Sequence, residues 1–301
     1  MSRWLKVSIY VIGVLIGVIA VGMVVVYAST TRRMHRTYEI PDATLVVRRD
    51  SATIEYGRHI VETRGCTDCH GANLGGGVVI DEPMIARVWA PNLTAGEGGV
   101  GRDRTPADWE RSIRRGVSRD GRPLWIMPSR EYNVLSDDDV AAAIAYLETV
   151  PPVDQAVPAN RAGPMGRLLF FLGKIPLLAA ESIDQNVTSR AAPPVGPTVE
   201  YGRYLASGCT GCHGAGFSGG PIPGMPPDAK PAANLTPDPT TGLGAWSESD
   251  FFTALREGRR PDGTALSDQM PWRVAAKLTD DEIRAIYMYL RTLEPKPLGE
   301  R

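Results

Sequence analysis

The sequence predicts an all-α protein in which one small helical domain occurs twice, after an N-terminal helix that spans a membrane. Three observations support this: an uncharged apolar run, an internal duplication, and apolar residues at helical spacing. We find no alternating pattern long enough to indicate a strand. We therefore divide the 301 residues into an anchor and stalk (1–51), two repeats (52–150 and 198–301) and a Pro/Ala-rich linker (151–197) between them.

The first element is the apolar run, residues 7–27, which contains 21 uncharged residues. At about 1.5 Å per residue it spans a hydrocarbon core of about 30 Å. Trp4 and Tyr27 flank the run as interfacial anchors do. A secretory signal has a shorter apolar core of about 7–15 residues, so we expect a retained anchor, with cleavage as the alternative. Gly13 and Gly17 form a GxxxG pair that could seat a partner helix, although glycine is common in membrane helices.

The charges around this helix bear on its orientation. Arg3 and Lys6 precede the run, and Arg32, Arg33 and Arg36 follow it. Taken alone, the positive-inside rule would place the rest of the chain on the cytoplasmic side.

The duplication is clearest at the cysteines. The chain has four, in two pairs, and a histidine follows each pair directly. The two CxxCH motifs are Cys66, Cys69 and His70, and Cys209, Cys212 and His213. The motifs are 143 positions apart, and in each repeat a methionine follows the histidine after 57 positions, at Met127 and Met270. Chance does not produce this agreement, so the two repeats are copies of one domain.

Each repeat is predicted to fold as three helices joined by two loops. The first helix, about residues 53–63 or 199–207, leads into the CxxCH motif and a glycine-rich loop. The last begins at an acidic segment, 136–139 or 279–282, because carboxylates are favourable at a helix N-terminus. The cap signals of the middle helix are Thr105 and Ser247 before it and Gly116 and Gly258 after it.

A CxxCH motif indicates a covalently attached haem. Two thiols one helical turn apart can each bond a vinyl group of a porphyrin, and the adjacent histidine then lies beside the iron. A structural zinc site needs four neighbouring ligands, and a thioredoxin-like pair needs a βαβ context. A disulfide pair in an exported protein would leave both histidines unexplained. We therefore expect two covalently bound c-type haems, with His70 and His213 as iron ligands.

The second axial ligand is expected to be Met127 in the first repeat and Met270 in the second. A thioether raises the reduction potential, which suits a carrier of single electrons. Met84 and Met225 are alternatives, but they are offset by 141 positions and precede the middle helix. His59 is a further alternative without a histidine at the equivalent position. Each methionine could also simply fill core space.

Polar residues at matched positions could bind the haem propionates. Arg114 and Arg256 could each offer a guanidinium fork, and Asn92 and Asn234, in the NLT turns, could donate hydrogen bonds. The alternatives are a solvated helix face for the arginines and ordinary turn chemistry for the asparagines.

The linker contains an apolar segment, residues 165–180, which Arg167, Lys174 and Pro176 interrupt. It is too short and too broken to cross a bilayer. Two interpretations stay open: packing at the domain interface, or contact with a partner or a membrane surface.

The order of motifs in each repeat (YGR, CxxCH, NLT, DG, MP and YL) resembles class I c-type cytochromes, over residues 52–150 and 198–295. More narrowly, it is similar to the cytochrome c subunits of bacterial membrane-bound alcohol and sugar-acid dehydrogenases, and to related di-haem cytochromes. Those subunits usually carry three haems, whereas this sequence has two motifs. The resemblance implies two tandem class I domains on the periplasmic side of the cytoplasmic membrane, which overrides the charge signal.

These observations predict a single-pass, membrane-anchored di-haem cytochrome c without catalytic residues, which relays single electrons between a donor and an acceptor redox protein. Alternatives are a subunit integral to a periplasmic dehydrogenase or to a respiratory or photosynthetic complex, and a di-haem peroxidase. A peroxidase needs an open iron site, and both repeats supply a methionine. Nucleic acid is not expected as a partner, because 33 basic and 34 acidic residues leave a net charge of −1.

Overall fold

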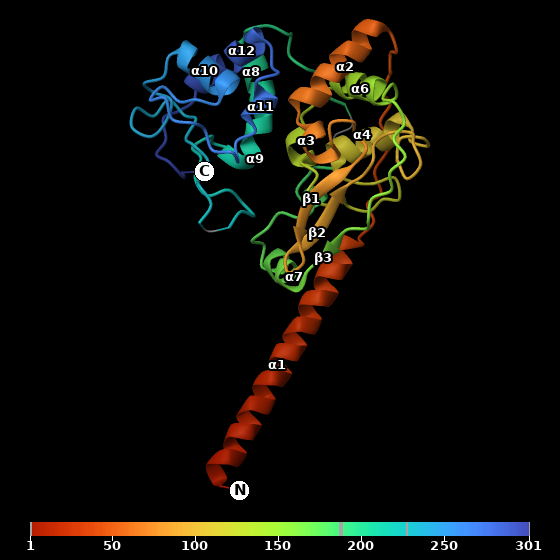
Figure 1. Cartoon of the computed structure of the whole chain (residues 1–301), viewed down its shortest axis with the longest axis vertical. Helices are drawn as coiled ribbons and strands as arrows, with labels where there is room; N and C mark the ends of the chain where they lie inside the picture. The colour runs from red at the N-terminus through yellow and green to blue at the C-terminus, as the bar shows by residue number, and fades with distance from the viewer. Residues whose placement is uncertain (1, 187–188, 227, 301) are drawn as a thin grey trace.

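The structure, a computed structural model, describes residues 2–186, 189–226 and 228–300. One long helix carries a head in which two mainly helical domains lie side by side (Figure 1). The elements of the first part are α1 (Arg3–Met34), α2 (Ser51–Thr63), α3 (Cys66–His70), β1 (Gly77–Glu82), β2 (Ala86–Ala90), α4 (Pro106–Arg115), α5 (Ser129–Tyr132) and α6 (Asp137–Leu147). Those that follow are β3 (Arg161–Ala162), α7 (Pro164–Phe171), η1 (Ala179–Glu181), α8 (Val199–Ala206), η2 (Ser207–Cys209), α9 (Thr210–His213), α10 (Glu248–Glu257), α11 (Trp272–Ala275) and α12 (Asp280–Arg291).

Helix α1 contains the predicted apolar run and is longer at both ends, with 32 residues. Its most apolar 18-residue window has a mean hydropathy of 2.9, and none of that window is buried in the protein. Within the described residues, α1 is the one helix whose length and composition allow it to cross a membrane. It is therefore compatible with a membrane anchor.

Each domain is built on one close crossing of its first and last helices, α2 with α6 and α8 with α12. Glycine stands at both crossing points. A Cβ atom on Gly57 would lie 1.9 Å from the carbonyl oxygen of Ala142, and one on Gly202 would lie 1.8 Å from that of Ala285. The two helix pairs can approach this closely only because these positions carry no side chain.

The predicted caps of the middle helices are confirmed. Thr105 and Ser247 each form a capping box with the aspartate three residues later. Gly116 and Gly258 end these helices in the left-handed region, with φ of 66° and 67°. These local signals are sufficient because both partners of each cap lie within one helical turn.

The prediction of an all-α fold is wrong in the first domain, which contains a small antiparallel sheet in the order β1-β2-β3. The pairing register of β1 shifts between Val78 and Ile80, and this irregularity breaks the alternation by which a strand is recognised. The third strand comes from the linker and pairs with β2. At the equivalent place in the described part of the second domain, a single bridge joins Gly220 to Ala232.

The linker between the domains fastens the first domain to the top of α1. Phe170, Leu177 and Leu178 from the linker form a small buried cluster with Met34 of α1. Helix α7 accordingly lies beside the upper end of α1 (Figure 1). The apolar segment 165–180 therefore packs within the protein along part of its surface.

The glycine crossings predict a matched pair of stability effects. Gly57→Ala should lower the free energy of unfolding of the first domain by about 2 kcal/mol, because the added methyl group forces the helices apart. Gly202→Ala should do the same to the second domain. Thermal unfolding followed by the absorbance of each haem would measure both. If either variant melts like the wild type, the crossing is looser than described.

Candidate haem-attachment sites

Each CxxCH motif forms one short helix, α3 or α9, directly after the first helix of its domain. Gly65, with φ of 71°, turns the chain from α2 into α3. None of the four motif cysteines forms a disulfide bond. Burial raises the pKa of the Cys66 thiol to about 12 and that of Cys209 to about 11, so both are neutral thiols at physiological pH. A thioether is also neutral, so this buried setting fits a thiol bonded to a vinyl group.

Both motif histidines are buried and oriented by a backbone carbonyl. Nδ1 of His70 donates to the carbonyl oxygen of Pro91 at 2.8 Å, and Nδ1 of His213 donates to that of Ala233 at 2.7 Å. This donation selects the neutral tautomer with its lone pair on Nε2, the form that ligates a metal. Burial also lowers the pKa of His70, which keeps its ring neutral. The donor set therefore fits a haem iron in both domains.

The glycine-rich loops after the motifs have the same fold in both domains. Leu74 and Phe217 occupy matched positions and adopt the left-handed conformation, with φ of 57° and 60°. The amide of Gly76 donates to the carbonyl of His70 at 2.8 Å, and Gly219 repeats this bond to His213 at 2.9 Å. The loops thus hold the motif histidines from their backbone side.

The asparagines of the NLT turns are buried and fully occupied by the protein. Oδ1 of Asn92 accepts from the amide and the hydroxyl of Thr94, and its Nδ2 donates to the carbonyls of Val153 and Gln155. Asn234 repeats the pattern: its Nδ2 donates to Thr241 and to the carbonyl of Lys296. These contacts support the turn role that the sequence left open. The propionate role stays untested, and we do not propose it.

Met127 and Met270 each pack against the core of their own domain, as does the first cysteine of the attachment motif. Met127 packs, half-buried, against the same hydrophobic core as Cys66, and Met270 packs against the core that includes Cys209. Ile126, directly before Met127, has a φ of 62°, a conformation that costs energy in a non-glycine residue. The peptide of this residue is held by a hydrogen bond from its amide to Leu177 in the linker, at 2.9 Å.

The competing ligands lie elsewhere. Met84 is 59% exposed in the turn between β1 and β2, and Met225 is 41% exposed in a loop of the second domain. Nε2 of His59 contacts the carboxylate of Glu282 in the other domain, at 2.9 and 3.0 Å. These positions do not support a role as ligands.

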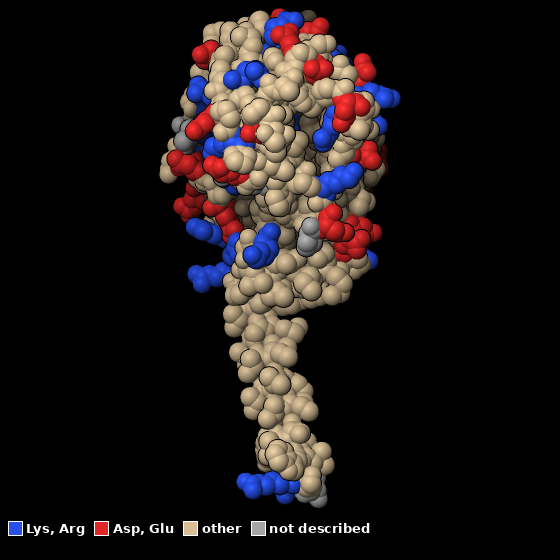
Figure 2. Space-filling model, turned by 90° about the vertical axis from the view of Figure 1, so that its left-hand side faces the viewer, with Lys and Arg blue, Asp and Glu red and all other residues tan. Residues whose placement is uncertain are grey.

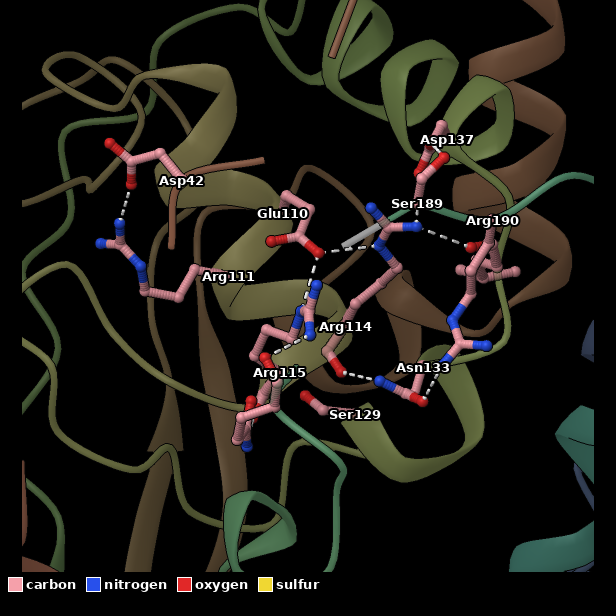
Figure 3. A network of polar contacts seen from close by, with 12 residues as sticks. Asp42, Glu110, Arg111, Arg114, Arg115, Ser129, Asn133, Asp137, Ser189 and Arg190 are labelled. Atoms are coloured by element: carbon pink, nitrogen blue, oxygen red, sulfur yellow. Dashed lines mark hydrogen bonds and ion pairs between the residues drawn. The ribbon is translucent and has the colours of Figure 1, made fainter. Parts of the chain in front are cut away.

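Arg114 belongs to a buried polar network on α4 rather than to an open binding fork (Figure 3). Its Nε donates to Glu110 at 2.9 Å, and its Nη1 donates to the carbonyl of Leu135 and to Asp137 at 2.7 Å. Arg115 shares the Glu110 carboxylate, also at 2.9 Å. All three charged residues of α4 in this network are buried, so they need each other as partners.

Arg256 makes the equivalent contacts in the second domain. It donates to the carbonyl of Ala276 and, at 2.7 Å, to Asp280 at the start of α12. In both domains the arginine therefore ties the middle helix to the N-terminus of the last helix. The predicted propionate role of Arg114 and Arg256 stays untested, and these contacts support a structural role instead.

The two domains meet through reciprocal polar contacts that the sequence did not reveal. The hydroxyl of Tyr204, in the second domain, donates to Asp139 in the first, and it accepts from the amide of Ser136 at 2.8 Å. Conversely, His59 in the first domain contacts Glu282 in the second. His59 and Tyr204 both follow a YGR triplet, and Asp139 and Glu282 are 143 positions apart. These two matches in the sequence could have indicated the contact between the domains. They are hard to recognise because the first repeat has a histidine where the second has a tyrosine.

The same contact brings the two attachment motifs together. Arg64, which ends α2 before Cys66, donates from Nη1 to the carbonyl of Leu205 at 3.2 Å, and its charge acts on the thiols of both Cys66 and Cys209. A Cβ atom on Gly211, inside the second motif, would lie 3.1 Å from Oε1 of Glu131 on α5. Both motifs therefore border the interface between the domains.

Comparison with known proteins agrees with this arrangement. The family model for cytochrome c oxidase, cbb3-type, subunit III matches residues 52–147, and the model for cytochrome c matches residues 199–294. The cytochrome c subunit of alcohol dehydrogenase (quinone) from Gluconacetobacter polyoxogenes is 30% identical over 292 residues, which cover 86% of this chain and 58% of the relative.

Two further relatives have the same character. The gluconate 2-dehydrogenase cytochrome c subunit of Pantoea cypripedii is 30% identical over 281 residues, covering 83% of this chain and 62% of the relative. A diheme cytochrome c-type protein of Cereibacter sphaeroides is 29% identical over 263 residues, covering 78% and 84%. The chain thus spans somewhat more than half the length of the dehydrogenase subunits. It belongs to the c-type cytochromes, with two cytochrome c domains and two covalently bound haems.

Proposed function

We propose that this protein is a membrane-anchored relay that passes single electrons through two haems, one in each of two class I cytochrome c domains. The observation that carries the proposal is the position of both attachment motifs at the interdomain contact, where Arg64 lies close to both Cys66 and Cys209. Haems attached there are adjacent within one chain. Electron transfer between them then needs no encounter between separate molecules.

In each domain two cysteines, one histidine and one methionine would hold one haem. The cofactor, when bound, provides a centre that gains and loses one electron. Cys66, Cys69, Cys209 and Cys212 would hold the porphyrins, while His70 with Met127 and His213 with Met270 would ligate the irons. The buried imidazoles are aimed by Pro91 and Ala233. With a histidine and a methionine on each iron, peroxide would find no free position, so we regard the peroxidase alternative as the weaker one.

We infer that the electron donor is a dehydrogenase at the membrane, because the relatives are named as cytochrome subunits of alcohol, gluconate and fructose dehydrogenases. An acceptor redox protein completes the relay. The second candidate is a protein that is itself an integral subunit of such a dehydrogenase complex. The same relatives support this candidate, because they are named as subunits. The GxxxG spacing of Gly13 and Gly17 would let a partner helix approach α1 closely, and this surface of α1 is exposed in the structure.

We infer that the haem domains lie on the periplasmic side of the cytoplasmic membrane, with α1 as a single span. The support is the apolar window of α1, which is not buried in the protein, together with the membrane-bound character that the resemblance implies. Protease added to spheroplasts should therefore digest both haem domains and leave α1 protected. Digestion only after the cells are lysed would place the domains in the cytoplasm.

The ligand assignment predicts the effect of replacing each methionine by histidine. Met127→His and Met270→His should each lower the potential of one haem by on the order of 0.1 V, because axial ligands set the potential over about 0.8 V. The other haem should keep its potential, since each domain has its own core. Spectroelectrochemical titration would measure both potentials.

Met84→His and Met225→His are the matched controls, because they make the same replacement at exposed methionines. They should leave both potentials unchanged. A changed haem potential in Met84→His, with none in Met127→His, would mean that Met84 is the ligand in the first domain. The same comparison between Met225→His and Met270→His applies to the second domain. Carbon monoxide should bind slowly or not at all to the wild type, and rapid binding to one native haem would favour a catalytic site instead.

The relay predicts intramolecular electron exchange. After pulsed reduction of one haem, the electron should reach the second with a first-order rate that does not depend on protein concentration. The double variant Cys209→Ala/Cys212→Ala, which cannot attach the second haem, should lack this phase. A rate proportional to protein concentration would mean that the haems exchange electrons only between molecules.

The interface also predicts a response to acid. Burial alone would raise the pKa of Glu282, but hydrogen bonds from His59 and Thr279 outweigh it, and this pKa lies below its ordinary value of 4.5. Such a carboxylate stabilises the fold above its unfolded pKa and loses that effect as the pH falls through its folded pKa. Between about pH 5 and pH 3 the free energy of unfolding should fall by about 1–2 kcal/mol from this contact.

Calorimetry of the wild type and Glu282→Gln across this range would test the prediction, since the variant should lack this part of the acid response. Glu248→Gln is the control. Glu248 is exposed, and among the described residues its one ion pair is with Arg284, which lies in the same domain. Equal acid responses in all three proteins would contradict the prediction.

A further inference from the structure

Helix α7 is attached to α1 at the point where α1 leaves its apolar run. Arg167 donates from Nη1 to the hydroxyls of Thr30 and Thr31 at 2.8 and 3.0 Å, and its guanidinium lies over the ring of Tyr27. One turn further along, the guanidinium of Arg33 lies 3.7 Å from the ring centre of Phe170. Tyr27 ends the uncharged run. Because a helix rises about 1.5 Å per residue, α7 lies within about 10 Å of the end of that run.

The side of α7 that faces away from α1 is apolar and open. Met165, Leu168, Phe171 and Leu172 are between 39% and 55% exposed. They follow helical spacing, whereas Gly166 and Phe170, on the opposite side, are buried. Both sides of this short helix are therefore apolar, and the described residues cover only one of them. An exposed apolar face of this kind marks a contact with another apolar phase.

The turn between β1 and β2 extends the same face. The amide of Met165 donates to the carbonyl of Met84 at 3.0 Å, so the turn is held against the start of α7. Met84 itself is 59% exposed. The exposed side chain of Met84 adds to the apolar area of α7, and the exposed carboxylates of Asp81 and Glu82 precede it at the end of β1.

The surface around the root of α1 has the same character. In Figure 2 the lowest band of the head is uncharged on the face shown and continues into the uncharged surface of α1, and basic and acidic side chains lie directly above this band. Lys174, just after α7, and Arg32, on α1, are exposed basic residues close to this surface. Lysine and arginine beside an apolar face are typical of a helix at the level of lipid headgroups.

We propose that α7 and the β1–β2 turn form a second membrane contact, a face that rests in the headgroup region of the bilayer that α1 spans. The inference rests on the proposed anchoring by α1. The lipid bilayer is the occupant because the face is continuous with the helix that would cross it. Two contacts, one through the bilayer and one on it, fix the first domain against rotation about α1. They also assign a role to Met84 and to the apolar linker segment.

The test uses the haem-loaded full chain in vesicles of phosphatidylcholine and phosphatidylglycerol. Its four native cysteines are bonded to haem, so one introduced cysteine is the only reactive thiol. Leu172→Cys and Met84→Cys probe the face. Ile16→Cys, within α1, is the control for a site inside the bilayer. Met288→Cys, an exposed site on α12 far from α1, is the control for a site in water (Figure 1). The probe is a membrane-impermeant maleimide, and each rate is divided by the rate in the unfolded chain.

Leu172→Cys and Met84→Cys should react at least about 10-fold more slowly than Met288→Cys, and Ile16→Cys should not react. A photoreagent dissolved in the bilayer should also label the α7 peptide but not the α12 peptide. Reaction at Leu172→Cys as fast as at Met288→Cys, with Ile16→Cys still protected, overturns this contact and leaves the anchor intact. Protection without photolabelling means that a protein covers the face, which also overturns it. Reaction at Ile16→Cys refutes the anchor itself.

Discussion

The hydrogen bond from each motif histidine to a backbone carbonyl is the interaction on which the rest of each domain depends. Its acceptors, Pro91 and Ala233, are fixed because the next residue is a buried asparagine. That asparagine is held in turn by the chain that follows the last helix, through Val153 in one domain and Lys296 in the other. The ring of each motif histidine is thus oriented by three segments far apart in the sequence, which couples the motif to the whole fold.

The features predicted correctly are those set by local chemistry. Caps such as Thr105 and Gly116 were found because a hydrogen bond to a residue three or four positions away leaves a sequence signature. The sheet was missed because a register irregularity between Val78 and Ile80 removes the alternation and β3 lies about 70 residues further on. The contacts of Asn92 could not be predicted either, since a spacing identifies a turn but not its distant partner.

The two domains differ in their polar contacts where the linker covers the first one. There the linker covers α4, and Arg115 donates to the carbonyl of Gln185 at 3.0 Å while Arg190 bonds Asn133 at 2.7 Å. Burial of the cations then requires the shared carboxylate of Glu110, since an unpaired buried charge is strongly destabilising. The corresponding Arg256 is partly exposed and has a simpler ion pair. The number of buried ion pairs in each domain therefore depends on whether the linker covers its middle helix, and not on the repeated sequence itself.

Duplication also explains why the attachment motifs face each other. When a domain packs on its own copy through reciprocal contacts, equivalent surfaces meet, as at an isologous interface. Here His59 reaches Glu282 and Tyr204 reaches Asp139, so the equivalent first helices lie at the contact from both sides. Those helices lead into the CxxCH motifs, so both motifs lie at the border of the interdomain contact. Replacing one residue of the equivalent pair, histidine by tyrosine, kept this geometry because both side chains donate to a carboxylate. The approach of the two motifs is thus a consequence of this symmetry, from which the hydrogen bond of Arg64 to the carbonyl of Leu205 departs.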